Sequence, residues 1–187
     1  MLYSKGNLET FLVTQFPIHI CSLDAVRETD LSIYDGVITI EDSRIEDPFR
    51  VESEHPKQLV LCFDDISVPL DDFIEPQEKH ILQALSFADR IGEGSILIHC
   101  HAGISRSSAI ALAIIAKRLG AGKEQDAIGA LEQINPHSRP NKSIVWLTDE
   151  ILERPEPVAD QCALTVLVLV HIRMNSERLL DILIHQI

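Results

Sequence analysis

Three short runs of aliphatic and β-branched residues, at positions 36–40, 59–63 and 95–99, constrain the fold of this chain most strongly. Each run is almost entirely apolar rather than alternating, which is typical of strands whose two faces are both covered. Segments with helical periodicity follow the second and third runs. This alternation predicts an α/β fold with a central, mainly parallel sheet of four to five strands and helices on both faces.

Local patterns predict the remaining elements. A further strand is expected at 8–14, at 18–21 or at both, and Ser22 is a candidate N-cap for a short helix over 23–29. Longer helices are expected over four ranges, 76–91, 107–119, 123–134 and 143–152. The helix at 107–119 carries apolar residues on nearly all sides and is therefore expected to lie buried in the centre.

Two prolines, Pro155 and Pro157, mark a break after the last of these helices. We therefore expect a main domain at 1–154 and a C-terminal helical extension at 155–187. The extension contains two apolar segments, at 163–172 and 179–187. These segments are candidates for packing on the domain or for the contact of a homodimer.

The 187 residues carry a formal net charge of −13. Such a surface repels nucleic acids and anionic membranes, so neither is expected as a partner. The longest apolar run, at 162–170, is far shorter than the roughly 20 residues of a membrane-spanning helix, and the N-terminus has no signal-peptide pattern. The cysteines lack the paired spacing of a zinc site or a disulfide scaffold. We expect a cytoplasmic protein with reduced cysteines.

The chemistry is concentrated in residues 99–108, His-Cys-His-Ala-Gly-Ile-Ser-Arg-Ser-Ser, which lead from the third apolar run into the central helix. The free N–H groups and the dipole of a helix N-terminus attract anions, and a loop over that end can direct more N–H groups to the same point. Gly103 allows this loop to curl, and Arg106 supplies a planar fork that can hold two phosphate oxygens. The same field favours the thiolate of Cys100, which predicts an ionised nucleophile facing a bound phosphate.

This segment matches, at every fixed position, the HCxxGxxRS/T signature of the cysteine-dependent protein tyrosine and dual-specificity phosphatases. The resemblance covers about residues 36–152 and is greatest to small dual-specificity-like enzymes, including bacterial-type protein tyrosine phosphatases. It implies that Cys100 forms a phosphocysteine intermediate and that Arg106 binds the phosphate. It also implies that the Ser107 hydroxyl helps the thiolate to leave, and that His99 orders the loop and tunes the thiolate.

The resemblance therefore implies an enzyme that hydrolyses phosphomonoesters on proteins or small molecules without a cofactor or a metal. Phosphotyrosine, or phosphotyrosine together with phosphoserine and phosphothreonine, is the expected substrate. The phosphate would contact the residues of the loop, which are His101, Ala102, Gly103, Ile104, Ser105 and Arg106. Relatives that act on phosphoinositides usually carry lysines in this loop, whereas positions 101–105 contain no Lys or Arg. A singly phosphorylated group is therefore expected.

Such a mechanism needs a proton donor for the leaving oxygen. In the family this donor is an Asp on the loop after the strand that precedes the nucleophile. Asp65 follows the second apolar run, 35 positions before Cys100, and is our candidate. Asp64 and then Asp72 are the alternatives. Because charged loop residues are usually only solvated, Asp71 and Asp72 are expected to lie in an exposed loop.

Other polar residues have simpler structural interpretations. Residues 41–56, with alternating charges and two prolines, are expected to form a solvated loop. Asn141 is expected to cap the last helix, with a supporting role near the loop, as the Pro-Asn pair of small family members implies. His80 is expected to be a surface or packing residue, and Cys62 a buried, inert cysteine of a strand.

Two other classes of function are disfavoured by the same residues. A non-catalytic phosphate-binding module would be expected to lack the cysteine, the arginine or the acid, and this chain has all three. A rhodanese-like sulfurtransferase also has a catalytic cysteine loop, but the Gly-x-x-Arg-Ser segment argues against it.

Overall fold

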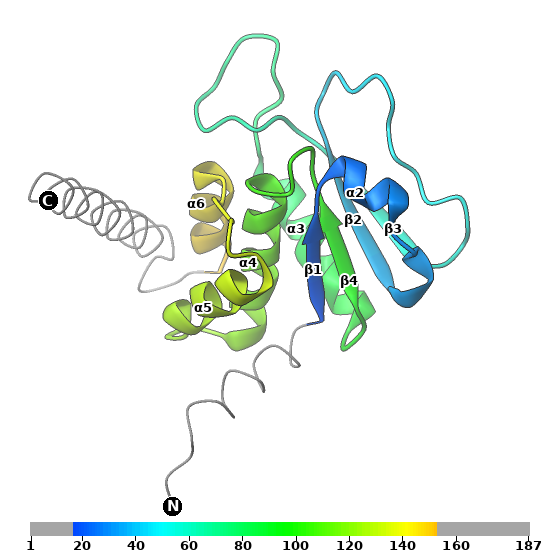
Figure 1. The fold of residues 1–187 in the computed structure, drawn as a ribbon. Helices are drawn as coiled ribbons and strands as arrows, with labels where there is room; N and C mark the ends of the chain where they lie inside the picture. The colour runs from blue at the N-terminus through cyan, green and yellow to red at the C-terminus, as the bar shows by residue number, and fades with distance from the viewer. Residues whose placement is uncertain (1–16, 153–187) are drawn as a thin grey trace, which may run out of the picture.

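The computed structural model describes residues 17–152, and its centre is a sheet of four parallel strands (Figure 1). The strands are β1 (Ile18–Cys21), β2 (Gly36–Glu41), β3 (Lys57–Cys62) and β4 (Ile96–His99). Their order across the sheet is β1-β4-β2-β3, so β4 and β2 lie in the middle. This parallel sheet with its helices confirms the predicted α/β fold class.

Helices follow all of the strands except β2. They are α2 (Leu23–Glu28), the 3₁₀ helix η1 (Leu31–Ile33), α3 (Glu78–Ile91), α4 (Arg106–Leu119), α5 (Glu124–Ile134) and α6 (Lys142–Ile151). Ser22 Oγ accepts a hydrogen bond from the N–H of Ala25 at 3.2 Å, and Asn141 Oδ1 accepts one from the N–H of Ile144 at 3.2 Å. Both residues thus cap a helix as predicted, because their side-chain oxygens satisfy free N–H groups of the first turn.

The two faces of the sheet are covered unequally. Helices α3, α4 and α5 contact the strands on one face, and α6 packs on α3 and α4 (Figure 1). On the other face Val26 of α2, Tyr34 and Phe49 pack against Val37 and Leu97. Helices therefore lie on both faces, as predicted, but within the described part of the chain the second face has only the short helix α2, Leu31 of η1 and loop residues.

Helix α4 is the centre of the thicker layer. It is buried from Arg106 to Ala116, as predicted, and it contacts α3, α5, α6, β1 and β4. Its alanines let neighbouring elements approach closely, while its isoleucines and Leu112 fill the remaining space. The N-terminus of α4 is thereby held firmly beside the end of β4.

Strand β3 differs from its prediction as a buried strand. It lies at the edge of the sheet, where its described neighbour is β2, and Leu61 is its one buried residue. Cys62, which was predicted to be buried, is exposed. The run at 59–63 is nevertheless apolar because Leu59 packs partly against the core and Phe63 is fully buried just beyond the strand.

Three predictions fall outside the residues that the structure describes. They are the strand at 8–14, the extension at 155–187 and the homodimer contact through its two apolar segments. Within residues 17–152, no helix combines the length and the apolar character needed to cross a membrane.

Candidate active site

The segments that follow β2, β3 and β4 meet at one edge of the sheet, because the carboxyl ends of parallel strands lie together. Cys100 directly follows β4, and Asp42 directly follows β2. Asp64 and Asp65 come shortly after β3. Residues 100–106, which we call the cradle, lead from β4 into the first residue of α4.

The cradle is held in place by its carbonyl groups, which point outward to donors on neighbouring segments. His101 O accepts from the N–H of Leu23 at 3.0 Å, Gly103 O from Asn135 Nδ2 at 2.9 Å, Ile104 O from the N–H of Arg139 at 2.9 Å, and Ser105 O from the N–H of Asn141 at 3.3 Å. In a planar trans peptide, the N–H of the next residue points the opposite way from the carbonyl. The N–H groups of residues 102 and 104–106 therefore turn inward, toward an anion site at the N-terminus of α4.

Gly103 is required by this shape. Its φ angle of +73° lies in the left-handed region that residues with a Cβ rarely adopt. A Cβ at this position would lie 2.6 Å from the carbonyl carbon of Cys21 and 2.8 Å from the backbone nitrogen of Ser22. The backbone conformation and the close approach to the end of β1 both demand a glycine.

Cys100 lies in the cradle with only 2% of its surface exposed. The N–H of Gly103 donates a hydrogen bond to its Sγ at 3.3 Å, and Ser107 Oγ lies 3.2 Å from the same sulfur. These two groups and the N-terminus of α4 can stabilise a negative charge on the sulfur. Burial and, to a lesser extent, the charge of Cys100 raise the pKa of the nearby Cys21 to about 11, which keeps Cys21 a protonated thiol.

Arg106 is buried, with 3% of its surface exposed. Its Nη1 donates to the carbonyl oxygen of Phe63 at 2.9 Å and forms an ion pair with Asp42 Oδ1 at 2.9 Å. Its Nε is buried and has no hydrogen-bond partner within the described residues. Because an unpaired buried donor is costly, this edge of the guanidinium is suited to an anion bound in the cradle.

Asp42 is a site residue that the sequence reasoning missed. The pattern of residues 41–56 placed it in a solvated loop, whereas the structure pairs it with the buried Arg106. A signal was present, because Asp42 follows a strand just as Asp64 does. Its connection to Arg106 depends on β2 lying next to β4, and the sequence does not reveal that strand order.

Asp64 is a structural residue in this arrangement. Its side chain is buried, Oδ1 accepts from the N–H of Ser43 at 3.0 Å, and Oδ2 accepts from the N–H of Ile74 at 2.7 Å. Burial raises the pKa of Asp64, but the hydrogen bonds from Ser43 and Ile74 outweigh it and hold the pKa below its usual value. The carboxylate thus joins the loop after β2 to both ends of the loop at 64–74.

Asp65 points the other way, toward the cradle. Its Oδ1 accepts two hydrogen bonds, from Ser105 Oγ at 2.7 Å and from Asn141 Nδ2 at 2.8 Å. Asn141 Nδ2 also donates to the carbonyl oxygen of Ile66 at 3.1 Å. Asn141 therefore has two functions in the structure, because its oxygen caps α6 while its nitrogen holds the loop at 64–74, which we call the acid loop, against the cradle.

The third acid candidate, Asp72, lies in the solvent-exposed part of the same loop, as predicted. Its side chain is 84% exposed and forms an ion pair with Arg44 at 3.6 Å. Arg44 Nη2 also donates to the carbonyl oxygen of Asp72 at 3.0 Å, and its guanidinium lies 5.4 Å from the ring centre of Phe73. These contacts link the acid loop to the loop after β2.

His99 is buried beneath the cradle. Its Nε2 lies 2.9 Å from Thr39 Oγ1, which in turn accepts a hydrogen bond from Gln58 Nε2 at 2.8 Å. The ring packs edge-on against Phe49 with 5.2 Å between the ring centres. Burial lowers the pKa of His99 to about 4, so the ring is neutral at physiological pH. The His99 ring is thus linked to β2 by its hydrogen bond with Thr39.

The remaining predicted residues separate into exposed and packed groups. His101, Ala102 and Ile104 are exposed at the mouth of the cradle. His80 is buried on α3, where its ring stacks on Phe63 with 4.8 Å between the ring centres. Burial lowers the pKa of His80, and its packing role agrees with the prediction.

No family model matches the chain. Its sequence is similar to that of human dual specificity protein phosphatase 15, with 33% identity over 91 residues, which make up 47% of this chain and 30% of that protein. The chain spans between 19% and 38% of the length of the curated relatives that it matches.

Two crystal structures share the fold. DUSP15 superimposes with a TM-score of 0.54 and 22% identity, covering 72% of this chain and 82% of that one. Human tyrosine phosphatase-like serine/threonine/tyrosine-interacting protein superimposes with a TM-score of 0.52 and 25% identity, covering 69% of this chain and 81% of that one. The chain is thus similar in sequence to a dual-specificity phosphatase over about half of its length, and it shares the fold of these two structures.

We expect the free energy of unfolding to fall as the pH drops from 6.5 toward 4. In this window the unfolded chain takes up a proton at His99, whereas the folded chain, with a pKa of about 4, does not. The shift corresponds to at most about 3 kcal/mol. Urea denaturation across this range should show a flatter pH dependence for His99→Gln than for the wild type. Identical pH dependence in both proteins would contradict the assignment.

Proposed function

We propose that this protein hydrolyses phosphomonoesters on phosphotyrosine, or on phosphotyrosine and phosphoserine or phosphothreonine, through a phosphocysteine formed on Cys100. The observation that carries the proposal is the cradle itself. Its carbonyls are tied outward, its N–H groups turn inward, and Cys100 and the free Nε of Arg106 are both buried at its centre. Among such enzymes, we propose that the protein is of the small, bacterial-type protein tyrosine phosphatase kind that its signature segment resembles.

The first chemical step is attack by the Cys100 thiolate on phosphorus. A P–S bond forms while the P–O bond to the leaving group breaks, and the charge on the phosphoryl oxygens is stabilised by the inward N–H groups and by Arg106. The ion pair with Asp42 and the hydrogen bond to Phe63 hold Nη1, so the guanidinium can present Nε without reorientation. Arg106 thus contributes a fork that is already in place before substrate binds.

Asp65 is the proposed general acid. Within residues 17–152, both of the hydrogen bonds that the Asp65 carboxyl group accepts, from Ser105 and Asn141, go to Oδ1. A proton on the carboxyl group is therefore favoured at Oδ2, which can pass it to the leaving oxygen as the P–O bond breaks. Asp64 has no such freedom, because both of its carboxylate oxygens accept N–H groups of the loops.

The second step is hydrolysis of the phosphocysteine. Asp65, now a carboxylate, takes a proton from a water molecule that attacks phosphorus, and the P–S bond breaks to release inorganic phosphate. Ser107 Oγ, 3.2 Å from the sulfur, can donate a hydrogen bond to the departing thiolate. No step in this sequence requires a metal ion or a cofactor.

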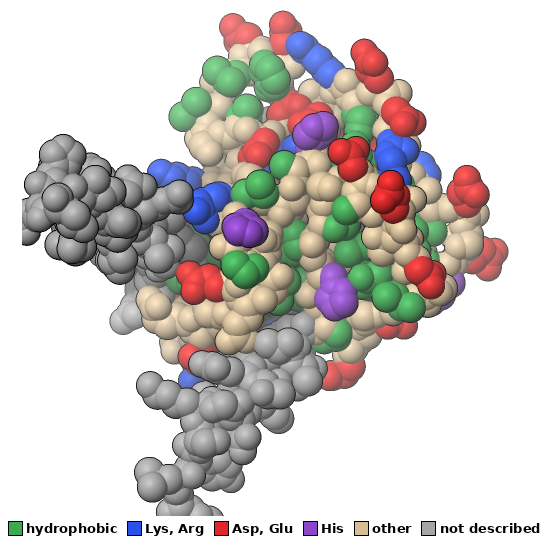
Figure 2. Space-filling model, viewed as in Figure 1, with side chains coloured by type: hydrophobic (Ala, Val, Ile, Leu, Met, Phe, Trp, Pro, Cys, Tyr) green, Lys and Arg blue, Asp and Glu red, His purple; other side chains and the backbone are tan. Residues whose placement is uncertain are grey.

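A single phosphate on an otherwise uncharged or basic substrate fits the surface around the cradle. Positions 101–105 have no Lys or Arg, and acidic side chains are numerous on the loops at the upper edge of the sheet (Figure 2). These charges oppose a second phosphate group. A reducing compartment such as the cytoplasm is the proposed location, because Cys21, Cys62 and Cys100 are free thiols.

The direct test is hydrolysis of p-nitrophenyl phosphate by the wild type and by Cys100→Ser. We expect turnover by the wild type in the presence of EDTA and none by the variant. The reason is that a serine hydroxyl does not ionise under conditions in which a cysteine thiol forms a thiolate. Circular dichroism of the variant controls for folding. Turnover that survives Cys100→Ser, or that EDTA abolishes, rejects the proposal.

Replacing Arg106 by Lys should be nearly as damaging as replacing it by Ala. A lysine carries the charge but cannot present a planar edge to two phosphate oxygens, nor reach Phe63 and Asp42 in the same way. The measurement is kcat/KM for both variants. If Arg106→Lys retains most of the wild-type value, Arg106 does not act as the phosphate fork.

Asp65→Asn should lower kcat by about 10²–10⁴-fold for substrates with poor leaving groups. The loss should be much smaller when the leaving group needs no proton, so a series of aryl phosphates separates acid catalysis from general damage. Asp64→Asn is the matched neighbour, and it should lower stability without changing the leaving-group dependence. The reverse pattern would assign the acid to Asp64.

Asn141→Ser extends the same measurement. Serine is also a good helix N-cap but lacks the amide that holds Asp65, so α6 should remain intact while kcat for poor leaving groups falls. In an Asp65→Asn background the same change should have little further effect on kcat. Equal effects in both backgrounds would mean that Asn141 does not act through Asp65.

A further inference from the structure

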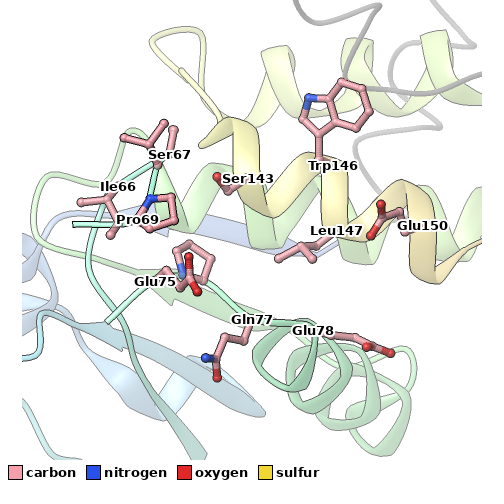
Figure 3. A pocket seen from close by; sticks show the side chains of 12 residues that line it. Ile66, Ser67, Pro69, Glu75, Gln77, Glu78, Ser143, Trp146, Leu147 and Glu150 are labelled. Atoms are coloured by element: carbon pink, nitrogen blue, oxygen red, sulfur yellow. The ribbon is translucent and has the colours of Figure 1, made fainter. Parts of the chain in front are cut away.

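A groove of about 580 Å³ lies between the acid loop and helix α6. Residues 66–69 and 75–78 line one side, and Ser143, Leu147 and Glu150 belong to the helical side (Figure 3). Figure 3 shows Leu147 and Glu150 on α6 facing Glu75 and Glu78 across the open space. This groove is separate from the cradle and has no function in the steps above.

The groove combines an apolar lining with an uncompensated negative charge. Val68 is 64% exposed and Trp146 is 54% exposed, which is high for large apolar side chains. Glu75, Glu78 and Glu150 line the groove, and the lining contains no Lys, Arg or His. These three carboxylates form no ion pair within residues 17–152. The chemistry therefore fits an apolar side chain next to a cation.

The groove begins beside the proposed general acid. Ile66, at one end of the lining, directly follows Asp65, and Asn141 donates hydrogen bonds to Asp65 Oδ1 and to the carbonyl of Ile66. Helix α6 starts at Lys142, the residue after Asn141. Along this helix, Ser143 and Glu150 are separated by a rise of about 10 Å, which roughly three residues of an extended peptide would span.

We propose that this groove binds the polypeptide segment next to the phosphorylated residue of a protein substrate, and that it selects an apolar residue followed or preceded by Lys or Arg. The proposal rests on the phosphatase function proposed above. The apolar side chain lies against Val68 and Leu147, and the cation lies among the three glutamates. The groove would thus select phosphopeptides that carry apolar and basic residues. The cradle by itself would not distinguish these peptides from other phosphopeptides.

The charge of the groove favours a basic peptide over a nucleic acid, an anionic membrane or a second copy of the chain. A phosphate-rich partner such as a nucleic acid or an anionic membrane would be repelled by the three glutamates. A second copy of the chain is also disfavoured over the whole surface, because each copy carries a net charge of −13. A basic peptide is attracted on both counts, and the attraction should weaken as the salt concentration rises.

The test compares two phosphotyrosine peptides on the full chain. One carries a leucine and two arginines within five residues of the phosphotyrosine, and the other carries glutamates in place of the arginines. In wild type, kcat/KM should favour the basic peptide, mainly through KM. The double charge reversal Glu78→Lys with Glu150→Lys should lower this preference on the order of tenfold, since two attractions become repulsions. Glu132→Lys, an exposed charge reversal on α5, is the control and should leave the preference unchanged.

Trp146 is the single tryptophan of the chain, so its fluorescence reports on the groove without catalysis. Titration of Cys100→Ser with the unphosphorylated basic peptide should change this fluorescence, and the charge reversal should weaken the response.

Unaltered peptide preference and no fluorescence response would overturn the groove proposal even if p-nitrophenyl phosphate is hydrolysed. A response that depends on protein concentration rather than on peptide would also overturn it, in favour of self-association. If p-nitrophenyl phosphate is not hydrolysed, the proposed function fails and the fluorescence titration still decides whether the groove binds the peptide.

Discussion

The outward hydrogen bonding of the cradle carbonyls is the constraint on which the site depends. Donors from Leu23, Asn135, Arg139 and Asn141 come from three different parts of the chain and hold one short loop. Inward-facing N–H groups repel one another, so a loop with this shape would relax if its carbonyls were not tied down. Much of the fold, including α2, the end of α5 and the start of α6, is arranged to supply these donors.

The burial of Arg106 depends on the same convergence. A guanidinium with 3% exposure would be costly without partners, and here one nitrogen is satisfied by Asp42 and by the carbonyl of Phe63. Those partners follow β2 and β3, while Arg106 begins α4. The parallel sheet therefore allows two segments, after β2 and β3, to hold a cation on a third, and it leaves the Nε edge for an anionic ligand.

The neighbouring acids Asp64 and Asp65 show how one loop can carry two different functions. Adjacent residues of an extended segment point to opposite sides. Asp64 points into the protein and joins the loops, and Asp65 points to the cradle and meets Ser105 and Asn141. The stability of the loop and the position of the proposed acid are thus set by consecutive carboxylates, and a groove with its own chemistry begins directly after them.

Sequence pattern was sufficient for the features that depend on neighbouring residues. The helix ranges were predicted to within about two residues, and Ser22 and Asn141 were predicted as caps, because periodicity and capping are local properties. The cradle was also predictable, since Cys100, Gly103 and Arg106 belong to one contiguous strand–loop–helix segment.

The features that depend on strand order or on side-chain direction were decided by the tertiary structure. They include the edge position of β3, the pairing of Asp42 with Arg106, the contact of Asp65 rather than Asp64 with the cradle, and the hydrogen bond between Asn141 and Asp65. Each of these joins residues that are distant in sequence, and such contacts exist only after the sheet has brought the carboxyl ends of its strands to one edge.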